Sequence, residues 1–316
     1  MEQDPSVFLF GEDLRANVFG TSPGFAARFG DMRVRDIPLS EAGAVGLAVG
    51  AAMTGLRPIL DLTISSFLYC AADQLISHMA KARFVHGGQY VLPVVVRTAC
   101  FYSGSNGAQH SDRPYPMFAG VPGLKIVVPS NALDAYLLLK ASIEEDNPVL
   151  FFEDVTLRGV RGRVEVTDED LASRATLGEA KVVEAGDDVL VIAIGGGVAI
   201  GRQVRELLAA EQVSVEVLDL RTVSPLDRDL ICSEAARIGR VVVVDPAHEQ
   251  CSVASEVAAL LVEEIFDSLQ APVRRVCTPN IHPPFNRALE RQLYPSRDGV
   301  LRAARSVLGS RSDREP

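Results

Sequence analysis

The residue with the clearest chemical potential is Glu41, a carboxylate at the head of a run of alanine, valine and glycine. The segment 39–62 reads LSEAGAVGLAVGAAMTGLRPILDL, with Ser40 before the acid and Gly55 and Pro58 towards the end. This pattern predicts a helix from about Ser40 to Gly55, followed by a buried strand. The acid is then either a first-turn residue that the helix dipole stabilises or a placed proton donor.

Three further side chains could take part in chemistry at the same place. Glu12 follows a strand predicted over 7–10, Phe67 lies in SSFLY, and His110 lies in the stretch GSNGAQHSD, which is rich in small and polar residues. Each also has an ordinary explanation, as a loop acid, a core phenylalanine and a loop histidine. The residues alone leave both explanations open.

Several longer motifs accompany these residues. They are IPLSEAGAVGLAVGAAMTGLRPILDL, DQLISHMAKARFVHGGQ, VPGLKIVVPSNALDA, EEDNPVLFFE and VLDLRTVSPLD. The combination resembles the beta subunit of thiamine diphosphate-dependent 2-oxo acid dehydrogenases, the decarboxylating component of the pyruvate, branched-chain and acetoin complexes. The resemblance covers nearly the whole chain, and the joint pattern is far more specific than any single motif.

The resemblance implies a role for each candidate residue. Glu41 would hydrogen-bond a ring nitrogen of the cofactor's aminopyrimidine and so promote loss of the thiazolium proton, which is acid–base work by a placed group. Phe67 would stack on the aminopyrimidine, and Glu12 would lie near the thiazolium. His110 would assist proton transfer to and from the acyl intermediate and its acceptor. The expected catalytic residues are therefore Glu41 and His110, and the expected cofactor-binding residues are Glu12, Glu41 and Phe67.

A metal site is implied only by the resemblance. In the family, the turn that corresponds to Glu145 and Asn147 lies beside a structural potassium ion that is bound largely by carbonyl oxygens. Hard cations prefer such oxygen ligands. Glu145 and Asn147 are therefore the expected potassium-site residues.

One half of a thiamine diphosphate site is missing from the sequence. The family's Mg²⁺–diphosphate motif is GDG followed by a later Asn, and neither GDM at Gly30 nor GDD at Gly186 matches it. The resemblance therefore implies an alpha subunit that carries this motif, in an assembly of two alpha and two beta chains. It also implies that the acyl unit passes to a lipoyl-domain acyltransferase or another carrier protein.

A glycine-rich turn in the second half offers a competing interpretation. Gly195, Gly196, Gly197 and Gly201 come after a predicted strand, and Asp219 follows near the end of the next one. A dinucleotide site would use residues in this order, but the spacing is not GxGxxG. Turns in parallel α/β structures also need glycine for tight packing, and in the family the second domain does not bind the cofactor.

Composition narrows the class of protein. The 316 residues are 47% hydrophobic and 23% charged, as in a protein with a sizeable core, and the formal net charge is −10. A net negative charge argues against nucleic acid as a partner. The five cysteines show no CxxC spacing, and the opening MEQDPSVFLF has no basic n-region. We therefore expect a cytoplasmic, reduced protein, with no membrane partner.

The order of apolar runs predicts an α/β protein of two domains. Short Val- and Ile-rich runs alternate with helical patterns in both halves, which is typical of mainly parallel sheets covered by helices. The helical patterns include one over 71–84 and a closing one over 286–308 that is interrupted at Pro295. The polar stretch 158–177 lacks sustained periodicity and is interpreted as a linker. We expect a transketolase-like pyrimidine-binding domain over 1–157 and a transketolase C-terminal-type domain over 178–316.

Three stretches depart from the family pattern: residues 100–102 and 113–120, which flank the His110 loop, and residues 248–251. The first is bulkier than usual, the second is proline-rich with Gly120 where a second histidine is common, and the third replaces a glycine-rich turn. Two alternatives therefore remain beside the dehydrogenase. One is a two-carbon acyl or ketol transferase of specialised metabolism that delivers to a carrier protein. The other is a non-catalytic scaffold for an alpha chain.

Overall fold

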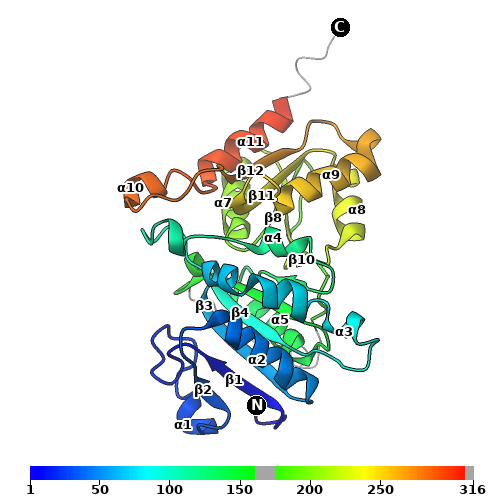
Figure 1. Ribbon diagram of the computed structural model, residues 1–316. Coiled ribbons are helices and arrows are strands. Elements are labelled where there is room, and N and C mark those ends of the chain that lie inside the picture. The colour runs from blue at the N-terminus through cyan, green and yellow to red at the C-terminus, as the bar shows by residue number, and fades with distance from the viewer. Residues whose placement is uncertain (161–174, 310–316) are drawn as a thin grey trace.

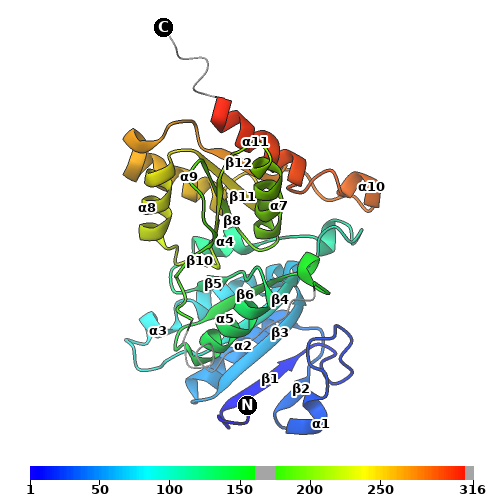
Figure 2. The same cartoon turned by 180° about the vertical axis from the view of Figure 1, so that it is seen from behind.

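The computed structural model describes residues 1–160 and 175–309, and it contains a seven-stranded and a five-stranded sheet. The seven-stranded sheet forms the lower half of the molecule in Figure 1 and the five-stranded sheet the upper half. Figure 2 shows the same division from behind. Residues 161–174, which hold most of the linker predicted over 158–177, lie outside the described residues. Both sheets are mainly parallel with helices packed on them, as the sequence predicts.

The first sheet is parallel throughout its centre. Only the pair β10–β5 is antiparallel. In spatial order its strands are β10 (Thr222–Ser224), β5 (Lys125–Val127), β6 (Val149–Asp154), β4 (Val95–Cys100), β3 (Arg57–Ile64), β1 (Val7–Gly11) and β2 (Val34–Asp36). Strands β3, β4 and β6 are Val-, Ile- and Leu-rich because helices bury both faces of the sheet.

The second sheet has the same character, with one antiparallel edge pair, β7–β9. In spatial order its strands are β12 (Arg274–Thr278), β11 (Val241–His248), β8 (Val189–Ala193), β9 (Val215–Asp219) and β7 (Lys181–Glu184). The α-helices of the two halves are α1 (Phe25–Phe29), α2 (Glu41–Met53), α3 (Ala82–Val85), α4 (Tyr115–Ala119), α5 (Ala132–Glu144), α7 (Gly197–Ala209), α8 (Arg228–Ile238), α9 (Val253–Ile265), α10 (Arg287–Glu290) and α11 (Arg297–Gly309).

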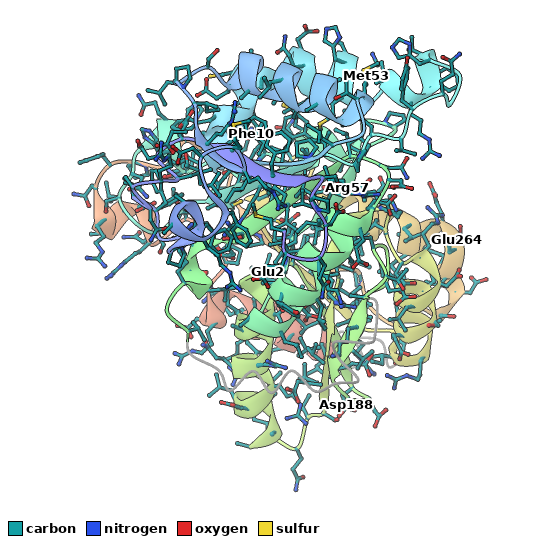
Figure 3. All side chains as sticks on the ribbon, turned by 90° about the horizontal axis from the view of Figure 1, so that it is seen from below. Glu2, Phe10, Met53, Arg57, Asp188 and Glu264 are labelled. Atoms are coloured by element: carbon teal, nitrogen blue, oxygen red, sulfur yellow. The ribbon has the colours of Figure 1, made fainter. Side chains whose placement is uncertain are left out.

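Helices α2 and α5 cover opposite faces of the first sheet. Val45 and Ala48 of α2 share a core with Leu60 and Leu62 of β3, whereas Leu138 of α5 belongs to a separate core on the other face. Seen from below in Figure 3, α2 lies along the outer edge of this domain, and Phe10 of β1 lies beneath it. Helix α2 is therefore a surface helix whose inner side packs on the sheet.

The structure corrects several expected elements. Instead of one helix over 71–84, it has a 3₁₀ helix η1 (Ser65–Ala71), a π-helical turn η2 (Gln74–Met79) and the short α3. Apolar residues recur every three or four positions in all three helix types, so periodicity cannot separate them. The closing helix predicted over 286–308 with an interruption at Pro295 is two helices, α10 and α11, which lie on either side of that proline as predicted. Strands β2, β7 and β10 and helix α8 were not predicted.

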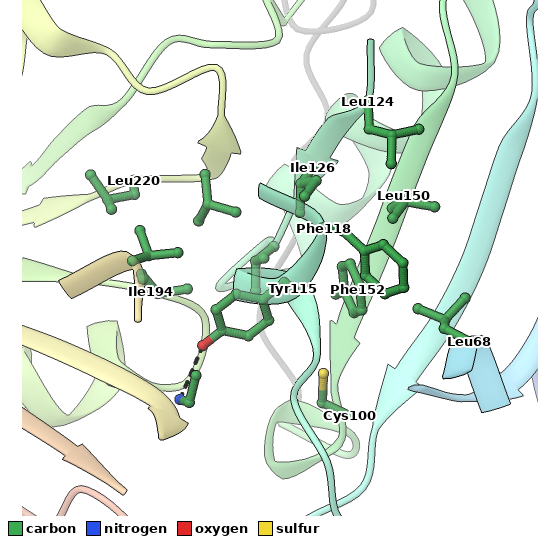
Figure 4. Packing of buried hydrophobic residues seen from close by; sticks show 14 of the residues in the cluster. Leu68, Cys100, Tyr115, Phe118, Leu124, Ile126, Leu150, Phe152, Ile194 and Leu220 are labelled. Atoms are coloured by element: carbon green, nitrogen blue, oxygen red, sulfur yellow. Dashed lines mark hydrogen bonds between the residues drawn. The ribbon is translucent and has the colours of Figure 1, made fainter. Parts of the chain in front are cut away.

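The two halves share one core. Strand β10 belongs to the second half of the sequence but pairs with β5 in the first sheet. Figure 4 shows Tyr115 of α4 between Phe152 of the first sheet and Ile194 and Leu220 of the second half, with its hydroxyl accepting a hydrogen bond from the Ala247 amide at 3.2 Å. No helix among the described residues is long and apolar enough to cross a membrane.

Candidate active site

The four candidate residues all follow the carboxyl ends of neighbouring parallel strands. Glu12 comes directly after β1, Glu41 follows β2, Phe67 lies in η1 directly after β3, and His110 lies in the short 3₁₀ turn η3 (Ala108–His110) after β4. These strands are adjacent in the order β4-β3-β1-β2. Carboxyl ends of parallel strands meet at one edge of a sheet, where such folds bind their ligands. The topology therefore gathers residues that lie far apart in the sequence.

Contacts between the short elements bring three of these residues closer. The turn η1, which carries Phe67, packs against both α2 and η3. The Phe67 and His110 rings meet edge to face, with their centroids 5.8 Å apart at 73°. Glu41 is the first residue of α2, and its half-buried side chain lies at the helix end that favours a negative charge.

Gly11 determines how closely Glu12 can approach the neighbouring strand. A Cβ atom at Gly11 would stand 2.2 Å from the Asp61 carbonyl oxygen, so only glycine fits where β1 passes β3. The next residue, Glu12, exposes only 5% of its surface. Its Oε1 atom is buried and has no hydrogen-bond partner among the described residues, which is unusual for a carboxyl group.

Burial raises the pKa of Glu12 from 4.5 to about 7, and the nearby charges of Glu41, Asp13 and Asp61 push it in the same direction. A carboxyl group is neutral when its pKa lies above the ambient pH, so Glu12 can hold a proton near neutrality. Perturbed carboxyl groups of this kind cluster at functional sites. The site therefore contains two interacting acids, Glu12 and Glu41, from adjacent strand ends.

A buried ion pair supports the floor of this site. Asp61 is 3% exposed. Its carboxylate accepts hydrogen bonds from the Thr21 hydroxyl at 3.1 Å and from the Thr63 backbone amide at 2.9 Å. Arg97 lies 3.5 Å from Asp61 and 2.5 Å from Glu153. Sequence reasoning missed this network. Its signal is a charged residue within a buried apolar strand, as in ILDL and VVVRTA.

The outer face of α2 is open. Gly43, Gly46, Leu47 and Gly50 are exposed, and Leu47 exposes 54% of its surface. Among the described residues, a Cβ atom at Gly46 or Gly50 would meet nothing within 4 Å. These two glycines are therefore not required by packing within the described part of the chain, although α2 buries Ala44, Val45, Ala48 and Ala52 on its inner side.

Comparisons with known proteins decide the family. Residues 1–158 match the transketolase pyrimidine-binding domain and residues 178–300 match the transketolase C-terminal domain. The beta subunit of an acetoin:2,6-dichlorophenolindophenol oxidoreductase from Bacillus subtilis is 38% identical over 98% of this chain and 93% of that protein. This chain belongs to the beta-subunit family of thiamine diphosphate-dependent 2-oxo acid and acetoin dehydrogenases.

Two further comparisons give the range of this beta-subunit family. The 2-oxoisovalerate dehydrogenase subunit beta of Bacillus subtilis is also 38% identical, over 97% of this chain and 94% of that protein. A solved structure described as a split gene transketolase, inactive beta4 tetramer, has a TM-score of 0.79 at 23% identity, covering 97% of this chain and 93% of that one. The latter similarity concerns the fold alone.

In this beta subunit, the predicted potassium-site residues bond to other protein groups. Glu145 pairs with Lys125 at 2.6 Å and accepts from the Asn147 side chain at 2.6 Å. Burial acts to raise the pKa of Glu145, but the bonds to Lys125 and Asn147 have the larger combined effect, so the pKa lies below its usual value of 4.5. The Asn147 side-chain oxygen accepts from Arg83 at 2.6 Å. No cluster of three or more His, Cys, Asp or Glu residues suited to a metal ion occurs in the described ranges. The potassium ion stays a prediction from the resemblance.

The glycine turn before α7 contacts the first domain of the beta subunit. The Gly196 amide donates to the Asp154 carboxylate at 2.7 Å, and Gly197 lies against Val244. A Cβ atom at Gly196 would stand 2.5 Å from the same carboxylate oxygen. Here the glycines allow a close approach between the two halves, in agreement with the packing interpretation.

Two of the departures from the family pattern meet in the beta subunit. Pro116 and Gly120 of the first half and Cys251 of the second line one groove of about 620 Å³ between α4, β10 and the start of α9. The first departure, Cys100–Tyr102, also contacts the second, because the Arg113 guanidinium lies over the Tyr102 ring at 5.1 Å. The Tyr102 hydroxyl donates to Asp154 at 2.5 Å. The altered residues near His110 are therefore part of the contact between the halves.

Proposed function

We propose that this chain is the catalytic beta subunit of a complex that decarboxylates a 2-oxo acid on thiamine diphosphate and transfers the acyl unit to a lipoyl group or another carrier. The observation that supports this most directly is the gathering of Glu12, Glu41, Phe67 and His110 at the ends of four adjacent strands. The family membership supplies the class of reaction.

The residues fit the cofactor's pyrimidine half. Glu41 stands at a helix start on an open face, where its carboxyl group can share a proton with a ring nitrogen. Phe67 offers a half-buried ring for stacking. Glu12 offers a buried Oε1 atom that lacks a hydrogen-bond partner within the part of the chain that the structure describes. Thiamine diphosphate, when bound, would supply the nucleophilic carbon and would take up the electron pair that stays behind when CO₂ leaves.

Glu12 and His110 handle protons at different places in this proposal. With a pKa of about 7, Glu12 can both hold and release a proton at working pH, which is what a general acid–base requires. His110 lies in a loop at the mouth of the site, in edge contact with Phe67, and acts on the acyl unit and its acceptor. In this proposal Glu12 and Glu41 serve the activation of the cofactor, and His110 serves the transfer of the acyl unit.

The diphosphate half belongs to a partner in this proposal. The sequence has no GDG motif, and the exposed glycines of α2 let a second chain approach the cofactor site closely. We propose an alpha subunit with the GDG motif, in an assembly of two alpha and two beta chains, and a lipoyl-domain acyltransferase or another carrier as acceptor. The cytoplasmic location is part of the same proposal.

The substitution Glu41→Gln tests the function. The substitution is made in the complex co-purified with its GDG-containing partner. Turnover is measured with pyruvate, 2-oxoisovalerate, acetoin or a ketose as donor and with an artificial electron acceptor. Loss of one placed acid–base group lowers turnover by about 10²- to 10⁴-fold. Glu263→Gln, an exposed acid on α9, serves as the matched control.

The outcomes separate this function from the alternatives. An enzyme of the proposed kind loses turnover in Glu41→Gln while its assembly and the Glu263→Gln activity stay intact. A complex whose turnover does not depend on Glu41 would contradict the proposal and favour the non-catalytic scaffold. Turnover only with a ketose donor would favour the two-carbon transferase.

A further inference from the structure

The part of the loop that precedes His110 is held by a carboxylate that is distant in the sequence. The backbone amides of Ser103 and Ser105 donate to the two carboxylate oxygens of Glu290 at 2.9 and 2.7 Å. Both serines have positive φ angles, 67° and 62°, which residues with side chains rarely adopt. The hydrogen bonds to Glu290 therefore stabilise an otherwise unfavourable backbone conformation, although Glu290 lies 187 positions from Ser103 in the sequence.

Glu290 is completely buried, and its position is well defined. It is the last residue of α10, whose N-terminus is capped by the Asn286 side chain. Its Oε1 atom also accepts a hydrogen bond from the Tyr294 hydroxyl at 2.8 Å. With three donors on a fully buried carboxylate, loss of one oxygen leaves an amide unpaired, which is costly.

The loop is held on the other side of His110 by the same segment. Arg113 is 4% exposed and donates to the Ser111 carbonyl at 2.8 Å. Its guanidinium lies over the Tyr102 ring at 5.1 Å and over the Tyr294 ring at 4.8 Å. Cation–π contacts of a desolvated arginine are among the stronger ones. Tyr294 thus contacts the anchors on both sides of His110.

The middle of the loop meets the same segment. Gly107, with φ of 72°, is buried, and a Cβ atom there would stand 3.3 Å from the Phe285 ring. Both Figure 1 and Figure 2 show α10 beside the loop between β4 and α4. The contacts well before, immediately before and after the η3 turn therefore all involve residues 285–294 of the second half.

We propose that residues 285–294 are a positioning element for His110, with Glu290 as its central residue. The segment fixes the position of the loop relative to the carboxyl end of β4. It thereby fixes the position of the His110 imidazole relative to the Phe67 ring. The inference rests on the proposed function, in which His110 assists acyl transfer. Glu290 contacts neither cofactor nor substrate, and acts through the loop.

The substitution Glu290→Gln tests the inference in the full complex. It replaces one acceptor oxygen with an amide donor. Two rates are compared: acyl transfer to free lipoamide, and reduction of 2,6-dichlorophenolindophenol. A misplaced catalytic group costs up to about 100-fold, so the ratio of lipoamide transfer to dye reduction should fall by about 10- to 100-fold. Glu216→Gln, the same change at another buried acid of the second half, leaves the ratio as in wild type.

A second comparison shows whether Glu290 acts through the histidine. In a His110→Ala background, Glu290→Gln should cause no further fall in lipoamide transfer, because coupled residues are not additive. An equal fall of both rates in Glu290→Gln, or a further tenfold loss in the His110→Ala background, would overturn the inference.

Hydrogen exchange gives a readout that does not depend on activity. Amides of residues 101–112 should exchange at least about tenfold faster in Glu290→Gln, while those of α2 keep their wild-type rates. If the complex shows no lipoamide transfer or dye reduction, the amide exchange rates of residues 101–112 still show whether the segment holds the loop. Tyr294→Phe, which removes one hydrogen bond and keeps the ring, should give a smaller change of the same sign. Unchanged exchange in both variants would refute the positioning role.

Discussion

Glu12 makes the stability of this chain depend on pH in a way that one substitution can isolate. Its pKa is raised from 4.5 to about 7 by burial and by the neighbouring carboxylates. The folded chain therefore binds this proton more tightly than the unfolded chain does. The resulting stabilisation is fully present below pH 4.5 and is lost as the pH rises to about 7.

The magnitude follows from the same values. Each pKa unit corresponds to about 1.4 kcal/mol, so raising the pKa of Glu12 from 4.5 to about 7 is worth at most about 3 kcal/mol. Glu12→Gln cannot ionise and lacks this dependence. Relative to wild type, its free energy of unfolding should therefore rise by about 2 to 3 kcal/mol between pH 5 and pH 8.

Urea unfolding of the full chain at pH 5 and pH 8 measures this difference, provided that the m value stays constant. Glu263→Gln, at an exposed acid, should track the wild type at both pH values. If Glu12→Gln differed from wild type by the same amount at both, Glu12 would be ionised throughout. The argument that it is a buried, unpartnered acid would then be refuted.

Three further substitutions probe the site and its surroundings. Phe67→Leu should weaken binding of thiamine diphosphate by about 2- to 10-fold, since an aromatic contact is worth about 0.5–1.5 kcal/mol; fluorescence titration of the complex measures this, and an unchanged affinity would exclude stacking. Gly46→Leu should leave the free energy of unfolding, measured with urea, unchanged or raise it by up to about 1 kcal/mol, while co-purification with the alpha chain is lost. Retained co-purification would contradict an interface on α2. Tyr115→Phe removes the hydrogen bond to the buried Asp245 carboxylate and should lower the free energy of unfolding by about 1–3 kcal/mol, whereas Tyr136→Phe at an exposed position should not.

Part of the arrangement of the candidate site could be predicted from the sequence because Glu12 and Phe67 follow strand ends. Buried strands are short apolar runs, and both residues stand after such runs, whereas Glu41 follows β2, a three-residue strand that was not predicted. The parallel α/β pattern then implies that Glu12 and Phe67 share one edge of a sheet. What spacing could not give is the adjacency of β1, β2, β3 and β4 in space. The family resemblance implied only that the four residues serve one cofactor.

The contacts between the halves were not predictable. Nothing in LERQLYP distinguishes the fully buried Glu290 from an ordinary surface acid, because buried glutamates are rare and depend on distant donors. Its donors are amides of Ser103 and Ser105, which every residue possesses. The three-residue strand β10 lies next to a proline and joins the first sheet only through β5, so no local pattern indicates it.

The helix predicted over 71–84 failed for a different reason. Leu75 and Met79 are buried as an amphipathic helix would require, yet the backbone passes from a 3₁₀ to a π geometry. Such local rewinding depends on packing against the sheet and on η3 rather than on residue type.

The central claim is that this chain holds only the pyrimidine half of a thiamine diphosphate site. Calorimetric titration of thiamine diphosphate with Mg²⁺ into this chain alone, into its alpha partner alone and into the mixture tests it most directly. Saturable binding, one cofactor for each beta chain, is expected only in the mixture and should weaken in Glu41→Gln. Equally tight one-to-one binding by this chain alone, or by the mixture irrespective of Glu41, would contradict it.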